Sequence, residues 1–581
     1  MRASNSRLIS RMFRLLQLPA IGLIITQLAS HAACATPPQG AGTTTVPTGS
    51  VPVVSRTTST GAGGASRTPQ VTPSQAVRVS FANNRLTVVD AAGRNVIAGW
   101  ELRVTHPSPD VRASASVRPL PDGFDLTYSF ANKGVRAAPI AALPLPPLQL
   151  GATIDHWDFE HSGWSVPLSG VGTRRQATYP NDLYSPVSVM SGLGLTVGMS
   201  VQYPVLSYRH DVSIATTQTS YGLWQPEMRL SGPMPAGDLW WGNNASIPPN
   251  EARTYTVSFR FAAQTGDWRT TLTPYRDHFQ RTYGRVAYNR QAKPIKGISL
   301  AAMDLQTPQN PNGWTSLAGA PDRNGYRTAA MAVQNALATS SRVVVWAPTG
   351  LAYQNRSLNY PPQFTSRWLA EGRAISPLND GVRQFSQIRT PAGKSWGLWW
   401  GHAAETSPGW DTLPLVRVDP SNAQHRAAIS REIRTATSCG ATLIGLDAFA
   451  HNHNPLWNLV GLLDQLKQEA PLATFCSEGR ACDVLHRLAP TWLDAYTMGR
   501  TSNGTASRIK GPFHLADFLV PGHETWAGMC YDRSKDAALF GANASSTTQT
   551  SDIQRVIRDG YVPVVWLNLN LDAIAASVPG K

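Results

Sequence analysis

Two carboxylates stand at the ends of consecutive apolar segments in the C-terminal half of the sequence. The run 441–447 ends at Asp447, and the run 472–478 ends at Glu478. Between them, residues 455–470 place Leu and Val side chains at helical spacing. A strand, a helix and a second strand in this order predict two parallel neighbouring strands. Both carboxylates are therefore expected on the same rim of a sheet.

This placement suits the hydrolysis of a glycosidic bond. Adjacent strands lie about 4.8 Å apart, and a retaining glycosidase holds its two carboxyl groups about 5 Å apart. One ionised carboxylate attacks the anomeric carbon while one protonated carboxyl donates to the leaving oxygen. Phe475 and Cys476 would desolvate Glu478 and raise its pKa, whereas Arg480 would act in the opposite direction.

Three other interpretations compete with this one. Acids at strand ends also cap helices or pair with arginine. A metal-dependent hydrolase is a second interpretation, because several metal-ligating residue types are expected near one rim: His402, Asp447, His451, His453, Glu478 and His523. The third is a barrel that binds a glycan without cleaving it. Release of reducing sugar, with and without a chelator, distinguishes these classes.

The elements that would position the two carboxylates begin near Ile295, where strand-like and helix-like segments alternate. We predict eight strands at 297–304, 342–347, 396–402, 441–447, 472–478, 492–498, 514–520 and 562–568. Helical runs fall between several of them, at 326–338, 422–438 and 552–559. This pattern predicts a (β/α)8 barrel spanning 291–581, with its active site at the C-terminal ends of the strands.

Residues at those predicted strand ends are candidates for substrate binding by position. Trp399 and Trp400 point to opposite faces of one strand, so only one of them can face the cleft. The chain has 18 Trp, a residue whose flat apolar face can stack on a sugar ring or fill a core. We assign Asp447 and Glu478 as catalytic, and the expected substrate-binding residues are Asp304, Trp346, Trp399, His402, Tyr496, His523, Glu524 and Asn568.

The segment 76–265 has a different pattern, in which apolar and polar residues alternate with a period of two. Turn signals such as Asn83-Asn84 separate the alternating runs. The pattern predicts an antiparallel β-sandwich. Residues 266–290 carry aromatic residues at helical spacing and predict a helix that connects the sandwich to the barrel.

The N-terminal 75 residues are expected to lie outside the folded part. Residues 1–36 combine Arg2, Arg7, Arg11 and Arg14 with a short apolar run and small residues around Cys34, as a secretory signal peptide does. Residues 37–75 are rich in Thr, Ser, Gly and Pro and predict a flexible linker. We therefore expect a secreted or periplasmic protein without a membrane span.

The formal net charge of +15 is spread over scattered arginines rather than concentrated in a basic stripe. This distribution argues against a nucleic-acid partner. We expect a monomer that acts on a carbohydrate and needs neither a cofactor nor a metal ion. Of the four cysteines after Cys34, Cys439 is expected to be a free buried thiol. At most one bridge is expected, between Cys482 and Cys530, and the alternative is that all four cysteines are reduced.

A sandwich followed by a barrel, with Asp447 ending strand four and Glu478 ending strand five, resembles the retaining α-glycosidases. The chain most resembles the endo-α-N-acetylgalactosaminidase family and its relatives. The resemblance implies that Asp447 is the nucleophile and Glu478 the acid/base. It departs from the related α-amylases at Gly445, where those enzymes have an arginine, and at Glu524, where their acid is normally an aspartate.

Overall fold

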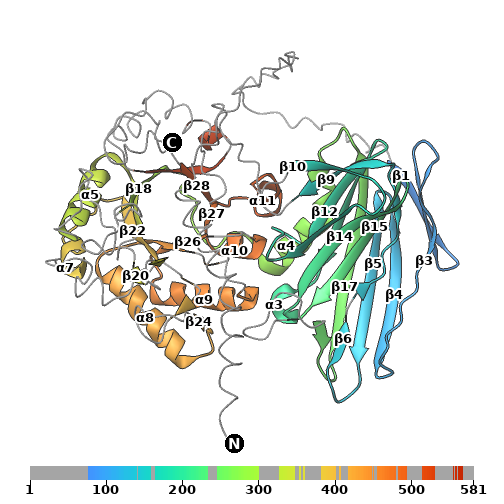
Figure 1. Cartoon of the computed structure of the whole chain (residues 1–581), viewed down its shortest axis with the longest axis horizontal. Coiled ribbons are helices and arrows are strands. Elements are labelled where there is room, and N and C mark those ends of the chain that lie inside the picture. The colour runs from blue at the N-terminus through green and yellow to red at the C-terminus, as the bar shows by residue number, and fades with distance from the viewer. Residues whose placement is uncertain are drawn as a thin grey trace, which may run out of the picture.

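The computed structural model shows an antiparallel β-sandwich joined to a closed parallel barrel (Figure 1). The structure describes residues 76–140, 142–158, 164–232, 245–299, 326–346, 352–354, 357–359, 381–400, 403, 405–406, 416–447, 449, 454–478, 482–493, 513–529, 554, 556–558 and 560–566. The expected fold class is confirmed. The proposed signal peptide, linker and Cys34 lie outside the described residues.

The sandwich consists of a seven-stranded sheet and a five-stranded sheet, extended by a three-stranded sheet. In sheet order, the seven strands are β10 (Trp164–Ser169), β9 (Thr153–Asp158), β12 (Val187–Gly192), β13 (Leu195–Gln202), β17 (Ala252–Ala263), β5 (Gly123–Asn132) and β4 (Val111–Leu120). The second sheet contains β11 (Arg174–Tyr179), β14 (Asp211–Ser220), β15 (Leu223–Ser231), β7 (Ala142–Leu143) and β8 (Leu148–Gln149). The third contains β1 (Val77–Ala82), β2 (Arg85–Asp90) and β3 (Asn95–Glu101). The pair β16 (Ala245–Ile247) and β6 (Ala138–Ile140), with helix α3 (Val205–Tyr208), completes this part.

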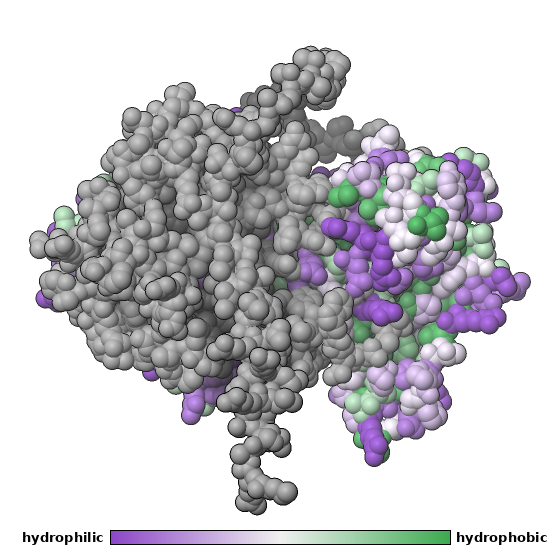
Figure 2. All heavy atoms as spheres, in the orientation of Figure 1, coloured by the Kyte–Doolittle hydropathy of each residue, from purple (hydrophilic) through white to green (hydrophobic). Residues whose placement is uncertain are grey.

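The period-two pattern explains how these strands form a core. On β5 the side chains of Phe124, Leu126, Tyr128 and Phe130 all point into the sandwich and are buried. The hairpin between β1 and β2 turns through Asn83-Asn84, both of which have positive φ angles. Figure 2 shows polar and apolar side chains interspersed over the described surface of the sandwich.

Eight parallel strands close the barrel: β18 (Ile295–Ser299), β19 (Arg342–Trp346), β22 (Ser395–Trp400), β25 (Leu443–Leu446), β26 (Thr474–Glu478), β27 (Thr491–Leu493), β28 (Thr525–Met529) and β29 (Val562–Trp566). Following the paired residues once around the ring from Val344 leads to register position 336, a stagger of 344 − 336 = 8 residues. Eight strands with a stagger of eight give the geometry of a TIM barrel.

Helices lie outside this ring and follow the predicted alternation: α5 (Tyr326–Thr339), α7 (Gly381–Phe385), α8 (Ala423–Ser438), α9 (Leu456–Glu469), α10 (Asp483–Leu488) and α11 (Phe513–Leu519). Two short hairpins join them, β20 (Ala352–Gln354) with β21 (Ser357–Asn359) and β23 (Glu405–Thr406) with β24 (Val416–Arg417). The side chain of Asn422 caps α8 by accepting hydrogen bonds from two backbone amides. Pro455 precedes α9, where its missing amide hydrogen costs no helical bond. The predicted helices over 326–338, 422–438 and 455–470 are confirmed within two residues at either end.

Three indoles fill much of the barrel interior. Trp399, Trp492 and Trp526 form one buried cluster with smaller apolar residues. Trp399 and Trp492 meet edge to face, with ring centroids 5.4 Å apart. These three tryptophans therefore belong to the core, which is one of the two roles expected for tryptophan in this sequence.

The predicted seventh strand at 514–520 is wrong. These residues lie in α11, and β28 follows at Thr525–Met529. The buried residues Leu515, Ala516, Leu519 and Val520 have helical spacing, so the segment packs one helical face rather than alternating faces. His523 and Glu524 consequently precede strand seven instead of following it.

The cysteines of the described residues are all reduced. Cys439, Cys476 and Cys482 are free and buried, as expected for Cys439. The expected Cys482–Cys530 bridge is wrong because Cys482 is a free thiol, and Cys530 itself lies outside the described residues. Within the described part of the chain, none of the helices has the length and apolar character needed to cross a membrane.

Candidate active site

Asp447 and Glu478 are neighbours at the C-terminal ends of strands four and five. The parallel pairing of β25 with β26 runs from Leu443–Thr474 to Leu446–Ser477. One further step along both strands brings Asp447 beside Glu478. Neighbouring strands lie about 4.8 Å apart, so the sequence-based expectation of two adjacent carboxylates at one rim agrees with the observed register.

Both side chains belong to the row that faces the inside of the barrel. Cys476 is part of the interior cluster, and its register partner is Gly445. Glu478 and Asp447 each stand two residues further along their strands, and alternate residues of a strand share a face. The two carboxylates therefore converge above the floor formed by Cys476 and Gly445.

A hydrogen bond fixes one oxygen of Asp447. The Nε1–H of Trp399 on β22 donates to Asp447 Oδ1 at 3.1 Å. A donor on a carboxylate favours its ionised form. Trp399 is buried, so its role is to orient the carboxylate rather than to offer an open stacking face.

Gly445 makes this arrangement sterically feasible. A Cβ atom at position 445 would lie 1.8 Å from Cε3 of Trp399. The indole thus occupies the space that any side chain at 445 would need, which gives a physical reason for the absence of the arginine found in the α-amylases. The glycine at position 445 and the Trp399 indole that packs against it therefore occur together.

Glu478 is more deeply buried than Asp447. It is 3% exposed, whereas Asp447 is partly exposed. Its register partner on the next strand is Trp492, a member of the interior cluster. Burial raises the pKa of the Cys476 thiol well above its usual value, with further increases from the charges of Glu524 and Glu478. The thiol is therefore neutral and gives Glu478 an uncharged floor.

His523 and Glu524 lie at the opposite end of the barrel from this pair. Glu524 immediately precedes β28, and its Oε1 contacts Arg342 Nη1 at 2.8 Å at the start of β19. The Nε1–H of Trp526 donates to the same oxygen at 2.5 Å. Burial raises the pKa of Glu524, but the Arg342 charge and the hydrogen bonds outweigh it and lower the pKa overall. The expectation that Glu524 and His523 line the C-terminal rim is therefore wrong, and the Arg342–Glu524 pair closes the base of the barrel.

The remaining predicted residues stay predictions. Asp304, His402, Tyr496 and Asn568 lie outside the described residues, and so does the side chain of Trp346 at the end of β19. For the metal-dependent interpretation, His402, His451 and His453 are likewise outside. Within the described ranges no group of three His, Cys, Asp or Glu side chains could hold a metal ion, and His523 lies away from Asp447 and Glu478.

Sequence reasoning missed two features of the site. Trp492 was expected to begin strand six, but its place beside Glu478 follows only from the register. Asp483, five residues after Glu478, was not singled out at all. A single acid after a cysteine carries no local pattern, since its partners come from segments about 200 to 300 residues away.

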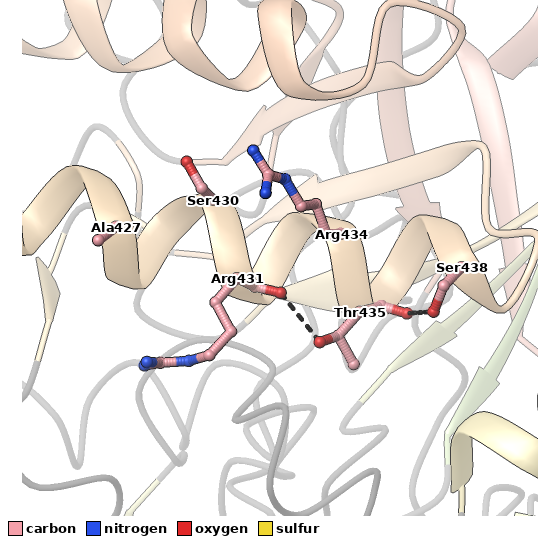
Figure 3. A pocket seen from close by; sticks show the side chains of 6 residues that line it. All are labelled: Ala427, Ser430, Arg431, Arg434, Thr435 and Ser438. Atoms are coloured by element: carbon pink, nitrogen blue, oxygen red, sulfur yellow. Dashed lines mark hydrogen bonds between the residues drawn. The ribbon is translucent and has the colours of Figure 1, made fainter.

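A hollow on the outer surface is separate from this site. Ala427, Ser430, Arg431, Arg434, Thr435 and Ser438 line it, and all six lie on α8 (Figure 3). Arg434 pairs with Glu469 at 2.9 Å. Because the hollow belongs to the helical layer rather than to the strand ends, it contributes nothing to the carboxylate pair.

No family model and no curated protein matches the sequence. The chain is similar to the solved structure of a GH36 α-galactosidase from Geobacillus stearothermophilus, with 11% identity and a TM-score of 0.48 over 85% of this chain and 68% of that one. It is also similar to an α-galactosidase from Thermus thermophilus, with 10% identity and a TM-score of 0.43 over 87% and 100% of the two chains. A third is an α-N-acetylgalactosaminidase from Bifidobacterium bifidum, with 10% identity and a TM-score of 0.46 over 88% and 93%.

Proposed function

We propose that this protein is a glycoside hydrolase that retains anomeric configuration, with Asp447 as nucleophile and Glu478 as acid/base. The observation that carries the proposal is the strand register. It makes the two carboxylates neighbours on the inward-facing row at the C-terminal ends of β25 and β26. This is the rim where barrel enzymes have their active sites.

The different surroundings of the two carboxylates decide their roles. Asp447 is partly exposed and accepts the indole hydrogen bond, and such a donor favours the carboxylate form that attacks the anomeric carbon. Glu478 is buried beside a neutral thiol and an indole, which suits a carboxyl that must begin protonated.

The reaction then takes two steps. As Asp447 Oδ forms a bond to the anomeric carbon, the glycosidic C–O bond breaks and Glu478 gives its proton to the departing oxygen. In the second step Glu478 takes a proton from water, whose oxygen attacks the anomeric carbon and displaces Asp447. Both carboxyl groups regain their initial protonation states.

The substrate class that we propose is α-linked glycosides, from the resemblance of the sequence. Aryl α-galactosides and aryl α-N-acetylgalactosaminides are practical first probes, because the similar solved structures are described as an α-galactosidase and an α-N-acetylgalactosaminidase. A panel that includes β-anomers of the same sugars tests the anomeric preference directly.

Isosteric variants test the proposal. Asp447→Asn and Glu478→Gln should each lower turnover of the best aryl glycoside at least about a hundredfold, because each removes either covalent or acid catalysis. Asp464→Asn, on the exposed face of α9, is the matched control and should retain full activity. Near wild-type turnover in either site variant, with an unchanged circular dichroism spectrum, would show that the carboxylates are not the catalytic pair.

We also propose that the chain is exported. The support is the arginine-rich, apolar and small-residue sequence of positions 1–36. Expression of the full chain with fractionation of cells and medium tests this directly. Recovery of an uncleaved chain from the cytoplasm alone would contradict it.

A further inference from the structure

A buried carboxylate joins the sandwich, the connecting helix and the barrel. Asp483 begins α10, five residues after Glu478, and is fully buried. Tyr179 and Ser185 of the sandwich donate hydroxyl hydrogen bonds to it, each at 2.8 Å. Tyr275, on helix α4 (Thr273–Tyr283) after the short helix η1 (Trp268–Leu272), donates a third at 2.6 Å. Figure 1 shows α4 and α10 between the sandwich and the barrel.

Four hydrogen-bond donors occupy the acceptor positions of the Asp483 carboxylate. Its Oδ1 accepts from Tyr179 and from the backbone amide of Val484, and its Oδ2 accepts from Ser185 and Tyr275. Each oxygen therefore uses both of its acceptor positions. Burial raises the pKa of Asp483 to about 6 against the opposing effect of these donors. At neutral pH the group is an ionised acceptor, and these four donors stabilise its charge.

A second interdomain contact holds the other end of α10. The Tyr184 hydroxyl lies 2.8 Å from Nδ1 of His486, and Nε2 of His486 lies 3.1 Å from the carbonyl oxygen of Glu524. The amide of Asp483 also donates to the carbonyl of Tyr184 at 2.9 Å. The six-residue helix α10 is thus attached to the sandwich at Asp483 and at His486.

The link from this cluster to Glu478 is short. Glu478 ends β26, and only residues 479–482 separate it from Asp483. Five Cα–Cα steps extend at most about 18 Å. After α10 the chain returns within two residues to β27, whose Trp492 is the register partner of Glu478. Short segments therefore connect α10 to β26, which ends at Glu478, and to β27 beside it.

We propose that the sandwich and the connecting helix α4 serve catalysis by positioning Glu478, through the hydroxyl groups of Tyr179, Ser185 and Tyr275 on Asp483. The inference rests on the proposed function of Glu478 as acid/base. It makes Tyr179, Ser185, Tyr275 and Asp483 positioning residues, since they act through the C-terminal end of β26 and not on the substrate. It also gives the sandwich a role that requires no glycan binding of its own.

The dependence of kcat on the leaving group distinguishes a positioning effect on Glu478 from a general disturbance of the folded structure. A dinitrophenolate departs without a proton, whereas a phenolate or alkoxide needs the Glu478 proton. Tyr179→Phe and Tyr275→Phe should lower kcat about tenfold or more for unactivated aryl glycosides and less than about threefold for dinitrophenyl glycosides. Tyr128→Phe is the matched control, because it removes a buried tyrosine hydroxyl that donates to the Pro144 carbonyl inside the sandwich. Equal losses for all leaving groups, or losses no larger than those of Tyr128→Phe, would overturn the proposal.

Hydrogen exchange tests the coupling independently of any activity. Amide exchange in the peptides covering 474–478 and 483–493 should accelerate about tenfold or more in Tyr179→Phe and stay unchanged in Tyr128→Phe. Ser185→Ala serves as a second variant if Tyr179→Phe does not fold, with the same expectation. Unchanged exchange would refute the positioning role even in an active glycosidase. Accelerated exchange in a chain that cleaves no glycoside would leave the coupling intact and refute the proposed function instead.

Discussion

At the scale of single residues, the site depends on an indole that holds a carboxylate. Trp399 donates to Asp447 and lies against Gly445, where a side chain would clash with it. Asp447 and Glu478 themselves could be predicted because each ends an apolar run. The role of Trp399 could be predicted only in part, because the sequence shows that Trp399 and Trp400 occupy opposite faces of one strand but not which of them hydrogen-bonds to Asp447.

Trp399→Phe should lower kcat about ten- to a hundredfold with little change in KM. The loss of a hydrogen bond to a charged group is worth about 1.5 to 3 kcal/mol, and each 1.36 kcal/mol is a factor of about ten in rate. Trp396→Phe, a buried tryptophan of the same strand that packs against Phe385, is the control for lost volume. Steady-state kinetics of both variants check the expectation, and equal effects would show that only packing matters.

Gly445→Ala should destabilise the protein by about 1 to 3 kcal/mol, the usual cost of overpacking a core. The added Cβ would meet the Trp399 ring at 1.8 Å, so the indole must move away from Asp447. Activity should therefore fall together with the urea midpoint. An alanine variant with unchanged stability would contradict the close approach of these two strands.

At the scale of elements, parallel neighbouring strands determine the stereochemistry. β25 and β26 are directly paired, which favours the short carboxylate separation of a retaining enzyme over the longer one that leaves room for the water of an inverting enzyme. We predict retention of anomeric configuration. Proton NMR of the first-formed sugar, recorded before mutarotation, measures it, and an inverted anomer would rule out this geometry.

The elements also show where sequence reasoning succeeded and failed. Strands with β-branched or aromatic runs, such as those at 342–346 and 395–400, were predicted closely. The segment 514–520 was predicted as a strand, but its buried residues follow a helical period and its short length hid that pattern. The error moved Glu524 from the base of the barrel to its rim, although its ion pair with Arg342 is a base contact.

At the scale of the whole molecule, the interface between sandwich and barrel is rich in buried titratable groups. Burial lowers the pKa of His523 to about 4, and burial followed by the nearby His523 ring lowers that of His486 well below its usual value. Their rings lie 4.7 Å apart at this interface. His486 and His523 come from separate segments of the chain, so the sequence alone could not predict that their rings lie side by side.

These histidines predict a loss of stability in acid. The unfolded chain takes up protons near pH 6.5, whereas folded His523 does so only near 4, so the unfolding free energy falls as pH drops from about 6.5 to 4. Asp483 acts in the opposite direction over about pH 4 to 6, because its raised pKa makes the folded chain hold the extra proton. Comparison of His523→Gln with the wild type isolates the histidine contribution, since Asp483 is common to both. Urea midpoints should fall less steeply with acid in the variant, and identical pH profiles would contradict the assignment.

The most direct test of the account is the identity of the residue that carries the sugar during turnover. The Glu478→Gln variant, supplied with a dinitrophenyl glycoside of the preferred sugar, should form the covalent intermediate and hydrolyse it slowly. Rapid acid quenching, proteolysis and mass spectrometry then locate the sugar. We predict a glycosyl ester on the peptide that contains Asp447, and none in the Asp447→Asn variant. A sugar on any other residue, or an enzyme that turns over without a covalent intermediate and inverts the anomer, would contradict the central claim.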